Sequence, residues 1–376
     1  MENKTFIFGT PVTGDNFTDR EKETRRLHAN FTHGVNTILI SPRRWGKTSL
    51  VKKVIDSVRD EDIKIVYMDV FACRNPEEFY ARFAESIVRQ TSSKSEEWIE
   101  NINSFLHRFS PKLKLSAGSE LELTLSFDVA PKKEDAGSIL DLPEKIAGKK
   151  NCRIVVCIDE FQQIGEFKDS ITFQRQLRSV WQHQQRVSYC LFGSKKHLMT
   201  SLFAKTSNPF YQFGDIIFLD KIPTSNWKEY IMSRFQSSGK KISEELAEKV
   251  CTLVDNQSNY VQELAWILWI NTDKVAHAED LDSSFLELLD HNSRLFERMT
   301  ETLTATQLNF LKAITEGVHK EFTRQEVLTS YHLGTASNIK RLKDSLLQKD
   351  LIDISNSTIY ISDPVFRHWL VRSLFK

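Results

Sequence analysis

The sequence contains few cysteines and no long hydrophobic run. Its 376 residues include five cysteines, scattered along the chain without a Cys-x-x-Cys pair. Such a set argues against a disulfide scaffold and a zinc site, and it favours reduced thiols in a cytoplasmic protein. No segment approaches the roughly 18 apolar residues that a membrane span requires. Residues 1–8 include Glu2 and Lys4, so we expect no secretory signal there.

An excess of either charge is also missing. The chain has 51 Lys and Arg residues against 50 Asp and Glu residues. This balance excludes a polycationic coat for nucleic acid, so any nucleic-acid surface must be a local patch. Hydrophobic residues make up 40% of the chain, which is enough for buried cores, and the length predicts two or three domains.

Residues 1–222 alternate between short apolar runs and helical patterns. A parallel sheet with helices on both faces produces this alternation, so the segment is predicted to be an α/β core. Alternating apolar and polar residues near 111–130 predict a hairpin insertion, which follows a helical pattern at 96–109. The five predicted core strands lie at residues 36–40, 63–70, 153–158, 187–192 and 215–219.

The pattern changes after Pro223. Residues 223–300 contain only helical patterns, which predict an all-helical domain. In residues 301–376, three short helical patterns precede two strand-like runs joined by Ser355-Asn356-Ser357. Three helices followed by a β-ribbon describe a winged helix-turn-helix.

The strongest chemical signal lies between the first predicted strand and the helix after it. Ser41 to Thr48 fit the Walker A pattern G-x-x-x-x-G-K-[ST], except that Ser41 replaces the first glycine. In such a loop, backbone N–H groups surround phosphate oxygens, Lys47 reaches the β- and γ-phosphates, and the Thr48 hydroxyl binds Mg²⁺. The alternative is a chance Gly-Lys-Thr at the start of a helix. The residues predicted to contact a bound ATP are Pro42, Arg43, Arg44, Trp45, Gly46, Lys47, Thr48 and Ser49.

Two acidic residues at the end of the third predicted strand give a Walker B signal. Asp159 is predicted to hold Mg²⁺ through water, and Glu160 to polarise the attacking water as the catalytic base. Open α/β sheets bind ligands at the carboxyl ends of their strands, where this signal and the loop both fall. At the end of the next strand, Ser194 either contacts the γ-phosphate or the water, or only marks an ordinary strand exit. The predicted catalytic residues are Glu160, Lys47 and Ser194, and the predicted metal residues are Thr48 and Asp159.

Several motifs in order resemble the archaeal-type ATPase family, a member of the STAND branch of P-loop ATPases that is related to AAA+ proteins. The resemblance implies an ATP-binding switch with slow hydrolysis. It also implies that residues 223–300 form a helical lid between the ATPase core and the winged helix. The motifs, which cover nearly the whole chain, are Phe17 to Glu23, Pro42 to Leu50, Ile158 to Gln162, Phe192 to Ser194 with His197 and Met199, Pro209 to Tyr211, Tyr260 to Gln262 with Trp269, and Asp363 to Phe366 with Trp369 and Leu370.

The sequence departs from that family at two places. Ser41 stands where the family commonly has glycine. The family's lid motif reads roughly G-x-P-Y-Y-V-Q, whereas here Asn256-Gln257-Ser258-Asn259 precedes Tyr260. These changes affect a turn in the phosphate loop and a turn before the lid helix.

Five arginines are candidates for the site, and each has a functional and a purely structural interpretation. Arg43 and Arg44 either meet a phosphate, an acidic lid residue or a partner subunit, or form a solvated pair. Arg175, Arg178 and Arg186 are candidates for an arginine that stabilises the transition state, although each also fits an exposed position near the helix before the fourth strand.

Three functions are compatible with these patterns. The first is an ATP-hydrolysing switch, and the others are an ATP-regulated DNA-binding protein and a nucleotide-locked scaffold with little turnover. Glu160 favours the first over the third, because a scaffold needs no base. The predicted recognition helix, residues 336–348, carries Lys340, Arg341 and Lys343, yet residues 301–376 hold ten Lys and Arg against eight Asp and Glu. That surplus of two is weak for DNA binding. The alternatives are that this domain packs on the ATPase core or binds a protein partner, and an oligomer is compatible with the sequence.

Overall fold

The structure is a computed structural model that describes residues 5–12, 14–91, 113–117, 123–127 and 136–375. Within these residues the chain forms two compact units. Residues 20–220 make one, which we call the core unit. Residues 1–19 and 221–376 make the other, which we call the helical unit. The N-terminal segment, which the sequence patterns grouped with the α/β core, therefore packs with the helical unit.

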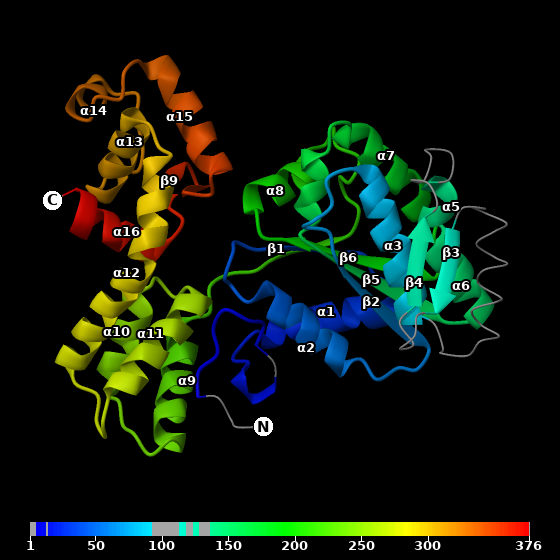
Figure 1. Cartoon of the computed structure of the whole chain (residues 1–376), viewed down its shortest axis with the longest axis horizontal. Coiled ribbons are helices and arrows are strands. Elements are labelled where there is room, and N and C mark those ends of the chain that lie inside the picture. Colours follow the sequence, from blue (N-terminus) through cyan, green and yellow to red (C-terminus); the bar gives the residue numbers. More distant parts are fainter. Residues whose placement is uncertain (1–4, 13, 92–112, 118–122, 128–135, 376) are drawn as a thin grey trace. The chain divides into compact units, whose positions relative to one another are not determined.

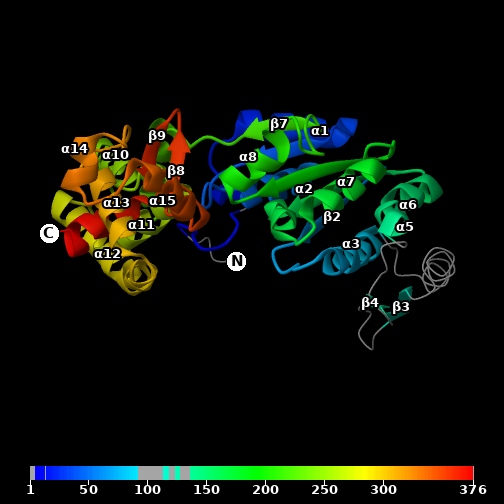
Figure 2. The same ribbon diagram turned by 90° about the horizontal axis from the view of Figure 1, so that it is seen from above.

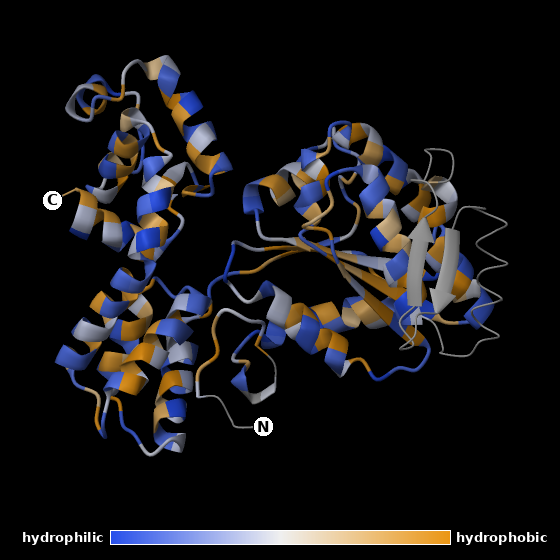
Figure 3. Cartoon of the chain, in the orientation of Figure 1, coloured by the Kyte–Doolittle hydropathy of each residue, from blue (hydrophilic) through white to orange (hydrophobic). Residues whose placement is uncertain are grey.

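The core unit is built on a five-stranded parallel sheet (Figure 1). All five predicted strands are present, and the predicted fold class is confirmed. Figure 3 shows these strands coloured as hydrophobic over most of their length, as expected for strands covered on both faces. In spatial order the strands are β2 (Ile63–Asp69), β5 (Arg153–Asp159), β6 (Val187–Gly193), β1 (Thr37–Ile40) and β7 (Asp215–Phe218).

Helices cover both faces of this sheet (Figures 1 and 2). One face carries α1 (Glu21–His33) and α2 (Lys47–Ser57). The other packs a large aromatic cluster from α3 (Pro76–Thr91), α7 (Ser170–Trp181) and neighbouring segments against the strands. Because side chains alternate along a strand, each strand contributes to both layers.

The segment after α3 agrees with the sequence predictions in part. Two antiparallel strands, β3 (Leu113–Ala117) and β4 (Leu123–Phe127), lie where the hairpin was predicted. The helical pattern predicted at 96–109 lies outside the described residues. Two short helices, α5 (Ala136–Leu140) and α6 (Leu142–Lys150), have no counterpart in the sequence predictions. The core unit also contains η2 (Phe161–Glu166) and α8 (Lys196–Ala204), whereas η1 (Gly14–Asn16) belongs to the helical unit.

The helical unit begins with four helices and ends with the elements of a winged helix. A long helix, α12 (Ala278–Glu301), runs from the first group into the second. The first group also contains α9 (Thr224–Ser237), α10 (Glu244–Leu253) and α11 (Ser258–Asn271). The second contains α13 (Ala305–Thr315), α14 (Gln325–Ser330), α15 (Ala336–Gln348), the antiparallel pair β8 (Ile352–Ser355) and β9 (Thr358–Ile361), α16 (Pro364–Trp369) and η3 (Leu370–Leu374).

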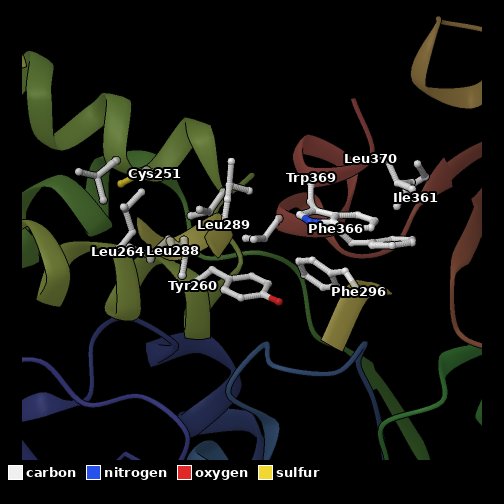
Figure 4. Packing of buried hydrophobic residues seen from close by; sticks show 14 of the residues in the cluster. Cys251, Tyr260, Leu264, Leu288, Leu289, Phe296, Ile361, Phe366, Trp369 and Leu370 are labelled. Carbon is white, nitrogen blue, oxygen red and sulfur yellow. The ribbon is translucent and has the colours of Figure 1, made fainter. Parts of the chain in front are cut away.

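Both groups share one hydrophobic cluster (Figure 4). Phe296 of α12 packs against Phe366 and Trp369 of α16, with ring centroids 5.1 and 5.7 Å apart. The Trp369 indole also donates a hydrogen bond to the Ser293 hydroxyl at 2.9 Å. The predicted boundary near residue 300 thus falls inside a continuous core, and the division into lid and winged helix stays a prediction.

The altered lid motif has a backbone that suits both a glycine and a proline at the changed positions. Asn256, at the position of the family's glycine, has φ of +53°, in the left-handed region that asparagine tolerates. Ser258, at the position of its proline, is the first residue of α11, where proline is favoured but not required. The substitutions therefore preserve the turn before Tyr260.

No helix in the described part of the chain is long and apolar enough to cross a membrane.

Candidate functional site

The loop between β1 and α2 places the start of α2 at the carboxyl edge of the sheet. Gly46 has φ of +85°, which glycine adopts without strain, and Arg44 has φ of +67°. Ser41 is buried and does not take a positive φ, and its hydroxyl donates to the Pro42 carbonyl at 3.0 Å. Serine therefore fits the turn in place of glycine. The N-terminus of a helix such as α2 presents free N–H groups and a positive dipole end, both of which favour a phosphate.

Lys47, the first residue of α2, lies between two carboxylates. Its side chain is 8% exposed. Its Nζ atom is 3.9 Å from Asp159 Oδ1 and 3.8 Å from Glu160 Oε1. The structure thus brings together the predicted Walker A and Walker B residues. One cation faces two acids here, so the buried charge is not balanced by these side chains alone.

Asp159 ends β5 and accepts hydrogen bonds on both oxygens. Oδ2 accepts from the Thr48 hydroxyl at 3.1 Å and from the Tyr67 hydroxyl at 2.9 Å, and Oδ1 accepts from the Glu160 backbone N–H at 2.8 Å. Burial raises the pKa of Asp159 above its ordinary value, against the opposing effects of Lys47 and Tyr67. Burial, followed by the Asp159 charge, also raises the pKa of Tyr67, so the phenol remains a donor.

This oxygen-rich pair fits a hard divalent cation. Magnesium prefers carboxylate and hydroxyl oxygens and is usually held by few protein ligands together with phosphates. The Thr48 hydroxyl and the Asp159 carboxylate supply two such oxygens side by side. Burial raises the pKa of Asp159 and so disfavours its charged form, and a bound cation would favour that form. Thr48 and Asp159 would therefore hold Mg²⁺, which would neutralise charge on bound phosphates.

Glu160 is held in one orientation by two neighbours. Its backbone has φ of +54°. Its Oε2 accepts from the Ser194 hydroxyl at 2.8 Å and from the Gln162 amide. Burial alone would raise its pKa, but the attraction of Lys47 and the hydrogen bonds from Gln162 and Ser194 outweigh burial, so the pKa is lowered. Glu160 is thus ionised at neutral pH, as a proton acceptor must be.

Gln162 can occupy this position because residue 193 is a glycine. A Cβ atom on Gly193 would overlap the Gln162 side chain, and Gln162 is 2% exposed. Gly193, the last residue of β6, thus leaves room for the Gln162 side chain that holds Glu160. Ser194 follows directly, and the end of β6 lies beside the end of β5.

Two arginines brace the same region. Arg43 Nε donates to the Ser194 hydroxyl at 3.3 Å. Arg20, whose side chain is buried, donates to the Trp45 carbonyl at 3.3 Å and forms an ion pair with Glu23 at 3.5 Å. The Phe17 to Glu23 motif thus supports the phosphate loop through its arginine. Of the other predicted loop residues, Pro42 and Trp45 are half-buried, Arg44 is exposed and Ser49 is buried.

Two of the three candidate transition-state arginines lie at the opposite edge of the sheet. Arg186 directly precedes β6 and donates to Asn151 Oδ1 at 3.3 Å. Arg178 stacks over the Phe213 ring, 4.9 Å from its centroid, just before β7 begins. Arg175 is exposed on the middle of α7. None of the three therefore joins Lys47 and Glu160 within the described core unit.

Sequence reasoning assigned no role to Tyr67 or Gln162. Tyr67 was counted only as part of a buried strand, and Gln162 only as a member of a family motif. Their contacts depend on which strands are neighbours in the sheet, which a single sequence does not display. The one signal in the sequence for a role of Tyr67 was that it places a polar hydroxyl near the carboxyl end of a buried strand.

Two family models match the chain. Residues 17–264 match a family described as an ATPase domain predominantly from Archaea. Residues 294–372 match a family described as a "probable winged helix domain". No curated protein is similar enough to count as a relative.

Three solved structures have folds similar to that of this chain. The Walker-type ATPase Paby2304 of Pyrococcus abyssi has a TM-score of 0.68 at 16% identity, with 98% of this chain and 99% of that chain covered. The ORC2 protein of Aeropyrum pernix, in ADPNP and ADP complexes, has a TM-score of 0.59 at 14% identity, covering 96% and 98%. The ORC1 protein of the same organism, in complex with DNA, has a TM-score of 0.50 at 11% identity, covering 96% and 94%.

Proposed function

Because the chain belongs to the family of ATPase domains found predominantly in Archaea, we propose that it binds ATP with Mg²⁺ at the carboxyl edge of its sheet and hydrolyses it slowly. One observation carries this proposal: Lys47 lies within 4 Å of both Asp159 and Glu160, and the next residue, Thr48, donates a hydrogen bond to Asp159. Lys47 binds the β- and γ-phosphates, and Thr48 and Asp159 hold Mg²⁺.

Glu160 is the proposed base. It is ionised, it lies beside the phosphate-binding lysine, and it is oriented by Ser194 and Gln162. A lowered pKa makes a carboxylate a weaker base, because proton transfer to it is less favourable. The lowered pKa therefore supports the proposal of slow turnover. A scaffold that only locks nucleotide would gain nothing from a buried acid held in this way.

We further propose that nucleotide state is passed to the rest of the chain as a molecular switch. The family membership and the ADPNP and ADP complexes of the structurally similar ORC2 protein support this proposal. Continuous packing from α12 to α16 supports a joint response of lid and winged helix, because the two share one core.

Two measurements on the purified full-length chain test the proposed function. Calorimetry should show ATP binding that is stronger with Mg²⁺ than in EDTA. A phosphate-release assay should show slow, Mg²⁺-dependent turnover. A chain that binds no ATP under either condition would contradict the proposal, and one that binds ATP without releasing phosphate would support the scaffold instead.

DNA binding through the winged helix is a second candidate. Lys340 and Arg341 are exposed on α15, and Lys343 is half-buried. The fold is shared with an ORC1 protein solved with DNA. The small positive surplus of residues 301–376 gives little long-range attraction, so this candidate ranks second.

A further inference from the structure

Tyr67 lies on the strand next to Asp159, but two residues short of it. In the register of β2 and β5, Tyr67 pairs with Cys157 and Asp69 pairs with Asp159. Two residues along a strand span about 6.6 Å, which a serine or asparagine side chain does not bridge. The longer phenol does, and its hydroxyl lies 2.9 Å from Asp159 Oδ2. Side-chain length and register together place this hydroxyl on the carboxylate.

The backbone and ring of Tyr67 are both held in place. The Gln90 side chain of α3 brackets the residue: its Oε1 accepts from the Tyr67 N–H at 2.9 Å, and its Nε2 donates to the Tyr67 carbonyl at 2.8 Å. The ring lies 6.3 Å from that of Phe192, and Lys52 Nζ lies 5.7 Å from the Tyr67 ring centroid. The backbone and ring of Tyr67 therefore fix the position of its hydroxyl.

Two hydroxyls donate to Asp159 Oδ2, and they differ in origin. Thr48 belongs to the phosphate loop and is itself a candidate Mg²⁺ ligand, whereas Tyr67 comes from a strand outside the loop. A carboxylate has about four lone-pair sites, so it can accept from Tyr67 and still bind a cation. Partners of this kind orient metal ligands in many proteins.

We propose that Tyr67 is a positioning residue, which holds the Asp159 carboxylate in the orientation that Mg²⁺ requires. The proposal rests on the proposed function, because it assumes that nucleotide binds here with Mg²⁺. Removing the hydroxyl takes away the one of these hydrogen bonds to Asp159 that comes from β2, so the carboxylate is held less firmly. The loss of such a partner typically weakens metal affinity about 10- to 100-fold.

The test is calorimetric titration of ADP onto the full-length chain at a series of MgCl₂ concentrations, with EDTA as the baseline. The variant is Tyr67→Phe, which keeps the ring. The matched control is Tyr80→Phe, which deletes another hydroxyl of the core unit that donates to Gln176 at 2.8 Å, away from the site. Melting temperatures of both variants are measured alongside.

Tyr67→Phe should keep the wild-type ADP affinity in EDTA and should need about 10- to 100-fold more Mg²⁺ for half of the Mg²⁺-dependent gain. Tyr80→Phe should follow the wild-type curve. If Tyr67→Phe does not fold, Gln90→Met is used instead, and it should shift the Mg²⁺ requirement in the same direction by a smaller factor.

The outcomes separate this proposal from the proposed function. A Tyr67→Phe curve that overlays a Mg²⁺-dependent wild-type curve overturns the role of Tyr67 and leaves the proposed function standing. Equal shifts in Tyr67→Phe and Tyr80→Phe also overturn it, because the effect is then a general loss of stability. A wild-type chain without Mg²⁺-dependent ADP binding overturns both proposals.

Discussion

Each unit of the molecule contains a tyrosine that donates a hydrogen bond to an aspartate. In the helical unit, Tyr260 donates to Asp363 Oδ2 at 2.7 Å, and in the core unit Tyr67 donates to Asp159 Oδ2 at 2.9 Å. The other oxygen of Asp363 caps α16 by accepting from the Val365 and Phe366 N–H groups. That carboxylate is satisfied by the fold itself.

The surroundings of Asp159 are different. It shares the buried cation Lys47 with Glu160, and its pKa is raised by burial. The same pair of side chains thus serves two purposes. Asp363 completes a helix cap, so its pair with Tyr260 joins elements of one unit. Asp159 lies beside Lys47 and Glu160, so under the proposed function its pair with Tyr67 would position the carboxylate for a cation and phosphates.

Two residues of the lid motif form hydrogen bonds inside the helical unit. The Tyr260 hydroxyl is used inside the helical unit, and so is the Gln262 amide, whose Oε1 accepts from the Ile7 N–H at 3.4 Å. The motif residues therefore join the N-terminal segment, α11 and α16. Substitutions of these motif residues should therefore change the stability of the helical unit. Substitutions of the charged residues in the core unit should instead change nucleotide binding and hydrolysis.

The largest effect is expected from Glu160→Gln, which keeps the shape and removes the base. Phosphate release should fall by roughly 10²- to 10⁴-fold while ATP still binds with Mg²⁺. Glu166→Gln is the matched control. It makes the same chemical change at an exposed glutamate that forms an ion pair with Lys195. Turnover by Glu160→Gln at the wild-type rate would show that Glu160 is not the base.

A smaller effect on stability is expected from Tyr260→Phe. Loss of a hydrogen bond to a charged group costs about 1.5–3 kcal/mol. For a unit of this size each kcal/mol lowers the melting temperature by about 2–4 °C. Thermal unfolding should therefore shift down by several degrees, while the Mg²⁺ requirement for ADP stays as in the wild type. An unchanged melting temperature would remove the structural role assigned to this pair.

The smallest effect concerns the winged helix. If α15 contacts DNA, changing Lys340 and Arg341 together to Ala should flatten the log–log salt dependence of binding by about 1.8, at roughly 0.9 per lost contact. Lys343→Ala is the comparison, because that side chain is half-buried. Fluorescence anisotropy with a labelled duplex, with and without ATP, measures the slope. No binding at low salt in either state would eliminate the DNA candidate.

Local patterns were sufficient for the sheet and the phosphate loop. Apolar runs marked all five core strands, Gly46-Lys47-Thr48 marked the start of α2, and the family model confirms the resemblance drawn from the motifs. The short helices α5 and α6 were missed, because Gly137, Pro143 and Gly148 interrupt their helical pattern.

The supporting contacts of the site could not be read from the sequence. Tyr67 acts on Asp159 only because β2 and β5 are neighbours, and Gln162 reaches Glu160 only because Gly193 leaves room. Both depend on pairings between segments far apart in the chain. Asn256 shows the opposite case: it departs from the family pattern, yet it has a positive φ, which glycine adopts freely and asparagine tolerates.

The most direct test of this account is a calorimetric titration of ATP with Mg²⁺ onto the wild type, Lys47→Ala and Tyr260→Phe at a temperature where all three are folded. Lys47 makes a charge-assisted contact to phosphate worth roughly 1.5–3 kcal/mol, so Lys47→Ala should bind ATP about tenfold or more weakly. Tyr260→Phe should bind as the wild type does. Equal affinity of Lys47→Ala and the wild type would contradict the assignment of the phosphate site.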